Sequence, residues 1–365
     1  MEDDAWVIKV RRPVRREGSA QYMVLIVVSF ALSIIITRAF LSLSGYPQVG
    51  SGELHIAHVL WGGLLLFIAA LIPLLFANRQ AYRVSAILVG VGIGLFIDEV
   101  GKFITQRNDY FYPAAAPIIY LFFMFTILLL LQMRRREKLT ARAELFRALE
   151  ALQDWIYHPL NKKEQSVVEG RLVNVSTSNS PEFLVSLASQ LLTILQQDPR
   201  PAVVERSDLW ARYSNQFDRW ISERGLRILM AVGFLVMAAI AFKNPINFLL
   251  GHYLPPFLQA LVIDIHSGRW YGGETSPGLY QARLGMEIIL GCLLVISALL
   301  LFFKRPRYGI PLAFGTLMLY IVAVNVLLFY FEQFSTIIFV FYQFLLLLGL
   351  IYYRTHFTAG PKVKW

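Results

Sequence analysis

Long apolar runs alternate with short polar segments along this chain, and their lengths predict membrane-spanning helices. About 20 helical residues cross the hydrocarbon core of a bilayer. The expected spans cover residues 22–43, 54–76, 84–103, 114–133, 226–250, 281–303, 310–330 and 333–353. Hydrophobic residues make up 56% of the chain and charged residues 16%, against about 25% charged in an ordinary soluble domain. We therefore expect an all-α, polytopic transmembrane helix bundle of eight spans.

A polar stretch, residues 134–225, separates the first membrane half (22–133) from the second (226–353). It is too polar to enter the bilayer, yet its apolar residues recur at helical spacing. The stripes are Leu145, Leu149, Leu152 and Ile156, then Phe183, Leu184, Leu187, Leu191 and Leu195, and a third from Leu209 to Ile221. Residues 170–180, rich in Ser, Asn and Thr, indicate a linker, and Ser180 followed by Pro181 fits a helix start. We predict a small helical cytoplasmic insertion that serves as a scaffold or as the contact of a homo-oligomer.

Lysine and arginine gather on one side of the predicted bundle and so orient it. They precede the first span, lie in alternate loops and close the chain: Lys9, Arg11, Arg12, Arg15, Arg16, Arg79, Arg83, Arg134, Arg135, Arg136, Lys138, Lys304, Arg305, Arg307, Arg354, Lys362 and Lys364. The opposite loops hold Arg107 and Arg269 clear of the helix ends. Both the basic N-terminal segment 1–21 and the tail 354–365 are therefore expected in the cytoplasm.

The basic residues that give the chain its net charge of +10 are largely those that border the membrane spans, and this position indicates which partners to expect. Basic groups that border membrane spans attract anionic lipid head groups. We therefore expect the lipid bilayer as the partner and no nucleic acid, although a basic total is also typical of nucleic-acid-binding proteins. The single cysteine, Cys292, excludes an internal disulfide.

Two polar clusters lie within apolar runs that should meet. One covers residues 53–58 at the start of the second span, and the other covers residues 98–102 at the end of the third. Consecutive membrane helices are antiparallel, so the start of one lies beside the end of the next. Ionisable groups inside spans are costly and by default mark a functional site. The expected layer near the outer face comprises Arg38, Glu53, His55, His58, Asp98, Glu99, Lys102 and Asp109.

The residue types in this layer fit three interpretations. His55 and His58 are three residues apart and share a helix face, so with Asp98 they fit a divalent metal such as zinc. Asp98 or Glu99 would then be the general base, and thus the catalytic group, for a bound water. Alternatively, the charges neutralise one another and fasten helices, with Asp98 and Lys102 paired at a spacing of four. A pathway for protons or cations is the third interpretation.

The second half carries further candidates near the same face. Residues 251–280 hold His252, Asp264 and His266, and Glu287 follows Arg283 by one helical turn. A polar stripe in the last two spans indicates hydrogen bonds between helices or the wall of a cavity: Tyr320, Asn325, Tyr330, Glu332, Tyr342 and Gln343. In the first half, glycines 90, 92 and 94 lie inside a span with no strand before them, which favours close helix packing over a nucleotide-binding loop.

Four strings carry a resemblance to a known family. They are GYPQ at 45–48, LHIAHVLWGG at 54–63, GLFIDEVGKF at 94–103 and NDYF at 108–111. They resemble an uncharacterised family of bacterial polytopic integral membrane proteins, most specifically over residues 37–120. The resemblance implies a bacterial cytoplasmic membrane and supports the polar layer as the family's signature, but it transfers no mechanism.

These residues leave three classes of function open. The first is a membrane-embedded enzyme, a metal-assisted hydrolase or transferase acting on a lipid or lipid-linked substrate, which the shallow depth of the layer favours. The second is a proton- or cation-coupled transporter. The third is a structural or sensor membrane protein in which the cluster is salt-bridged and the insertion receives an outer signal.

Overall fold

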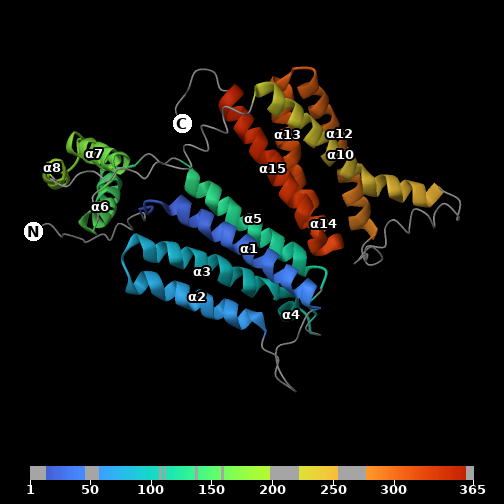
Figure 1. Ribbon diagram of the computed structural model, residues 1–365, viewed down its shortest axis with the longest axis horizontal. Coiled ribbons are helices and arrows are strands. Elements are labelled where there is room, and N and C mark those ends of the chain that lie inside the picture. Colours follow the sequence, from blue (N-terminus) through green and yellow to red (C-terminus); the bar gives the residue numbers. More distant parts are fainter. Residues whose placement is uncertain are drawn as a thin grey trace, which may run out of the picture. The chain divides into compact units, whose positions relative to one another are not determined.

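The computed structural model describes residues 14–45, 57–106, 109–110, 112–135, 139–157, 160–197, 222–253 and 277–358. Every regular element in these ranges is a helix, as predicted (Figure 1). Seven helical segments are long and apolar enough to cross a bilayer, which fits a multi-pass membrane protein. The chain forms two compact units, one of residues 1–97 and 123–209 and the other of residues 98–122 and 210–365.

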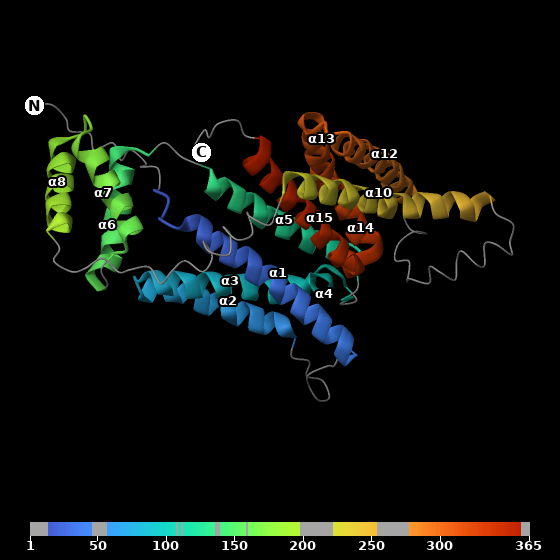
Figure 2. The ribbon, with the colours of Figure 1, turned by 45° about the horizontal axis from the view of Figure 1, so that its top comes forward.

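The membrane part of the first unit is built from α1 (Ser19–Ser44), α2 (His58–Leu75), most of α3 (Arg79–Asp98) and the second part of α5 (Ala115–Arg134). Helix α3 lies between α1 and α2 (Figure 2). Its glycines explain this position: Gly90 and Gly94, four residues apart, face α1, whereas Gly92 faces α2. Small residues let backbones approach closely where lipid supplies no hydrophobic drive for helix association. The expected close packing at these glycines is confirmed.

The second part of the first unit is a pack of three helices, α6 (Ala141–Tyr157), α7 (Lys162–Ser176) and α8 (Glu182–Gln196). Their shared core is apolar and includes Leu145, Leu152, Val168, Leu172, Val175, Ala188 and Leu195. The linker predicted at residues 170–180 was wrong as far as Ser176, because Val168, Leu172 and Val175 lie on one helix face and are buried. Helix α8 begins at Glu182, one residue beyond the expected start.

A short segment before α1 is tied to these helices by charged contacts. Glu150 of α6 accepts a hydrogen bond from the backbone N–H of Glu17 at 2.8 Å and pairs with Arg16 Nε at 2.9 Å. Glu17 in turn pairs with Arg171 of α7 at 2.8 Å, and Arg147 Nε donates to the carbonyl of Arg15. The end of the basic N-terminal segment is therefore part of the structure of the helical pack.

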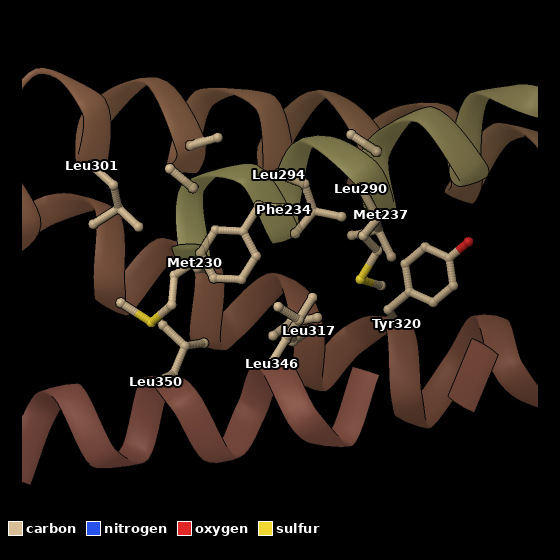
Figure 3. Close-up of a cluster of buried hydrophobic side chains, with 14 of the residues drawn as sticks. Met230, Phe234, Met237, Leu290, Leu294, Leu301, Leu317, Tyr320, Leu346 and Leu350 are labelled. Carbon is tan, nitrogen blue, oxygen red and sulfur yellow. The ribbon is translucent and has the colours of Figure 1, made fainter. Parts of the chain in front are cut away.

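The second unit contains α4 (Val100–Ile104), the first part of α5, α10 (Glu223–Tyr253), α12 (Pro277–Phe302), α13 (Pro306–Leu319), the π-helical turn η1 (Tyr320–Val324), α14 (Asn325–Glu332), the 3₁₀ turn η2 (Gln333–Thr336), α15 (Ile337–Tyr353) and η3 (Arg354–Thr358). Side chains from α10, α12, α13 and α15 converge on one apolar core (Figure 3). Phe234, Leu294, Leu317 and Leu350 lie at its centre and are almost fully buried.

The last apolar segment, Pro306–Phe357, is 52 residues long and reverses direction within itself. Gln333 has a φ of +50°, outside the helical region, and α15 then packs back against α13. This reversal falls at the break expected from the sequence. It divides the segment into two helical arms joined by η2.

Replacing Gly62 of α2 with alanine should destabilise the first unit. An added Cβ would lie 2.7 Å from the backbone nitrogen of Phe96 and 2.8 Å from the carbonyl oxygen of Gly92, neither of which can move alone. We expect a loss of about 1–3 kcal/mol, typical of overpacking, in the free energy of unfolding measured in detergent micelles. Gly63→Ala is the matched control, because nothing lies within 4 Å of its added Cβ and alanine favours the helix. Equal stability of the two variants would contradict this packing.

Candidate functional site

Two carboxylates are buried where α3 ends and α4 begins. Asp98 is 0% exposed and Glu99 is 1% exposed. The hydroxyl of Tyr110 donates to Asp98 Oδ2 at 2.5 Å, and Lys102 Nζ pairs with Glu99 Oε1 at 2.7 Å. Lys102 Nζ also lies 5.3 Å from the centre of the Tyr110 ring. One phenol and one ammonium thus face two adjacent carboxylates in what we call the first polar cluster (Asp98, Glu99, Lys102 and Tyr110).

Glycine 101 allows the loop that carries Tyr110 to reach this cluster. A Cβ at Gly101 would lie 2.7 Å from the carbonyl oxygen of Asp109 and 3.1 Å from that of Tyr110. The same loop is held by Thr105, whose hydroxyl accepts from the backbone N–H of Asp109 at 2.8 Å. The local backbone therefore positions the Tyr110 hydroxyl on Asp98.

The contacts of Lys102 and Asp98 differ from the prediction. The sequence suggested that they pair as residues four apart on one helix, but α3 ends at Asp98 and Glu99 leaves helical geometry at φ −91° and ψ 10°. Lys102 instead forms its ion pair with Glu99, three residues away. The role of Tyr110 could not be predicted, because no helical spacing links it to Asp98 across the intervening loop.

The remaining residues of the predicted layer are only partly described. Arg38 is buried near the end of α1, and His58 is the first residue of α2 and half-buried. Asp109 is exposed. Glu53 and His55 lie outside the described residues, as do Asp264 and His266 of the second half. Among the described residues, no three His, Cys, Asp or Glu side chains are grouped closely enough to bind a metal. The zinc site that includes His55 stays a prediction.

A second polar cluster lies in the second unit and comprises Arg283, Glu287, Glu332 and Asn244. Arg283 and Glu287 stand one turn apart on α12, and each is only 1% exposed. Arg283 Nε donates to Glu287 Oε1 at 2.9 Å, while its Nη2 donates to Glu332 Oε1. Asn244 Nδ2 of α10 also contacts Glu332 Oε1, at 3.4 Å. Two carboxylates thus share one guanidinium.

The surroundings of Arg283 are aromatic and apolar. Its Cζ lies 6.0 Å from the centre of the Tyr280 ring and 5.8 Å from that of Phe331. Glu332 is the last residue of α14, immediately before the reversal at Gln333. Helices α13 and α14 run back along α12, and this brings a carboxylate from a distant part of the chain to the arginine of α12. The sequence marked Arg283 and Glu287 as a pair but gave no spacing that links them to Glu332 or Asn244.

A third polar group lies among the helices of the same unit. Asn325 and Gln343, both 0% exposed, exchange two amide hydrogen bonds of 2.7 and 3.1 Å. Asn325 Nδ2 also contacts the hydroxyl of Tyr120, which donates to the carbonyl of Ile321 at 2.7 Å. The π-helical turn explains why the carbonyl of Ile321 accepts from Tyr120. In an α-helix the N–H of Asn325 would bond to Ile321, but here it bonds to the carbonyl of Tyr320. Asn325 and Gln343, two members of the predicted polar stripe, therefore form hydrogen bonds between helices.

Comparison of the whole chain with protein-family models, curated proteins and solved structures found no match. The described clusters offer carboxylates, an arginine, a lysine and phenols inside apolar helices. Such groups exchange protons and bind cations or polar head groups.

Tyr110→Phe should destabilise the protein by about 1–3 kcal/mol, because it removes a hydrogen bond to the buried carboxylate of Asp98. The change would be measured as the free energy of unfolding in detergent or nanodiscs. Tyr112→Phe removes a hydroxyl from an exposed ring two residues away and should leave stability unchanged. If Tyr110→Phe is as stable as Tyr112→Phe, the hydrogen bond to Asp98 contributes nothing to the free energy of unfolding.

Proposed function

We propose that this chain is a multi-pass transport protein of a bacterial cytoplasmic membrane whose cycle is coupled to protons or to a cation. The observation that carries the proposal is the second polar cluster. Among the described residues, two carboxylates, Glu287 and Glu332, contact one cation, Arg283, and both Glu287 and Arg283 are only 1% exposed. An anionic Glu287 beyond what this one cation balances is costly at a buried position, and an incoming proton or cation would neutralise it.

Two irregular stretches of helix beside the polar groups support this proposal. The π-helical turn at Tyr320–Val324 precedes Asn325, and the turn at Gln333–Thr336 follows Glu332. At membrane depth, irregular backbone is tolerated where it is buried in protein or lines a cavity. In many transporters, interrupted helices carry the sites for substrate and coupling ion.

The proposed topology has eight crossings, with both termini and the insertion in the cytoplasm. A continuous helix of 52 residues would be about 78 Å long, far more than the roughly 30 Å of a hydrocarbon core, so the reversal at Gln333 supports two crossings in Pro306–Phe357. The Lys and Arg asymmetry supports the orientation, in which the basic inner loops meet anionic head groups. In this topology the end of α3, the start of α12 and the end of α14 all lie at the outer face.

Proton or cation binding should produce a transient current in proteoliposomes adsorbed on a solid-supported membrane. A jump in pH, and separately a jump in sodium concentration, would distinguish a proton from a metal cation without requiring the transported substrate. We expect a current in the wild type and in Glu182→Gln, a charge change on the exposed surface of α8, and none in protein-free liposomes. Absence of a current in both jumps would overturn the proposal.

The metal-assisted hydrolase or transferase is a second candidate, favoured by the position of His58 at the start of α2. A helix that begins at His58 places its imidazole at a shallow depth, where water and lipid head groups reach. In this reading His55, His58 and Asp98 hold the metal, and Glu99 or Asp98 activates water.

Elemental analysis of the purified protein tests this second candidate. We expect about one divalent metal per chain, lost in His55→Ala and His58→Ala with little change in thermal stability, because shallow imidazoles contribute little packing. His356→Ala, at an exposed histidine of η3, should keep the metal. A wild-type protein without stoichiometric metal would exclude the metal-assisted mechanism.

A further inference from the structure

In the second polar cluster, the two carboxylate oxygens of Glu287 differ in their hydrogen bonding. Oε1 of this residue accepts a hydrogen bond from Arg283, whereas Oε2 is buried and has no donor within hydrogen-bond distance in the described part of the chain. The amide of Asn244 is the neutral donor that interacts with this carboxylate. A carboxylate oxygen without a donor is poorly stabilised as an anion in an apolar site. A carboxylic acid at the same position carries no charge there.

The groups that face Glu287 leave it with an unbalanced charge. Arg283 comes from its own helix and Glu332 from α14, so among the described residues one positive charge meets two negative ones. The neighbouring phenols are Tyr280 of α12 and Tyr320 of η1, and α10 contributes the neutral Asn244. Lys243, beside Asn244, is exposed, and the ionisable residues of α13, Arg307 and Tyr308, lie at its start, beside the turn that follows the far end of α12.

The number of ligand atoms available around Glu287 Oε2 suits a proton better than a metal cation. Hard metal cations take about six or more oxygen ligands. The described residues provide no group of three acidic, histidine or cysteine side chains for a metal. A single carboxylate oxygen needs one proton to become satisfied.

We propose that Glu287 Oε2 is the proton-binding atom of the transport cycle, a proposal that rests on the proposed function. A proton from the aqueous phase forms an O–H bond at Oε2 and makes Glu287 neutral. Arg283 stays protonated and keeps Glu332 as its charged partner, so the cluster as a whole becomes neutral. The side chain of Glu332 is 41% exposed, so the cluster reaches the surface of the described structure at this carboxylate.

Infrared spectroscopy of the full-length protein in lipid, recorded over a range of pH, tests this assignment. The wild type should show the carbonyl band of one protonated carboxylic acid that disappears as the pH rises and shifts in heavy water. The band should be absent in Glu287→Gln, an isosteric change, and present in Glu182→Gln. Glu287→Asp, which keeps an acid group, should retain a titrating band and covers the case in which the glutamine variant does not fold.

Three outcomes would overturn the assignment: a band that survives in Glu287→Gln, the absence of any such band in the wild type, or its loss on addition of sodium at constant pH. The last would identify a metal cation as the ligand. The test is separable from that of the proposed function. A current that persists in Glu287→Gln would refute the role of Glu287 alone, whereas a titrating Glu287 without any current would refute transport.

Discussion

Polar groups inside apolar helices must find partners within the protein, and this constraint organises the second unit. Water is absent from the hydrocarbon core, so each unpaired backbone or charged group there costs several kcal/mol. The π-helical turn takes the N–H of Asn325 away from the carbonyl of Ile321, and Tyr120 supplies the replacement donor. Arg283, almost fully buried, is held by two carboxylates from separate helices. The same constraint applies to Glu287 Oε2, which is buried with no donor within hydrogen-bond distance in the described part of the chain.

The membrane helices of the first unit pack together by a different interaction. Lipid chains are as apolar as leucine, so its helices gain little from burying apolar surface and instead rely on close contact. Glycines on both faces of α3 let α1 and α2 approach its backbone. The unit therefore combines glycine-mediated packing in its membrane helices with an ordinary aliphatic core in α6 to α8. Charged contacts of residues 15–17 hold the N-terminal segment to that helical pack.

Much of the fold could be predicted, because hydrophobic run length and spacing are local properties. The first six expected spans coincide with long helices to within several residues, and the last two, 310–330 and 333–353, fall within the single segment Pro306–Phe357 on either side of its reversal near Gln333. The linker assigned to residues 170–180 shows the limit: its Ser, Asn and Thr content concealed a helix that Val168, Leu172 and Val175 stabilise by burial. The local composition favours a loop at these residues, but burial of their apolar side chains in the tertiary core stabilises a helix instead.

The sequence by itself determined which residues are ionisable inside apolar runs, and thereby where the candidate sites lie. The tertiary structure decided their partners. Lys102 pairs with Glu99 because the helix ends at Asp98, and Tyr110 reaches Asp98 because Gly101 admits the loop. Asn325 meets Gln343 because the chain reverses at Gln333, and Arg283 meets Glu332 because α13 and α14 run back along α12. Such contacts depend on chain reversals and backbone approach, which helical spacing does not encode.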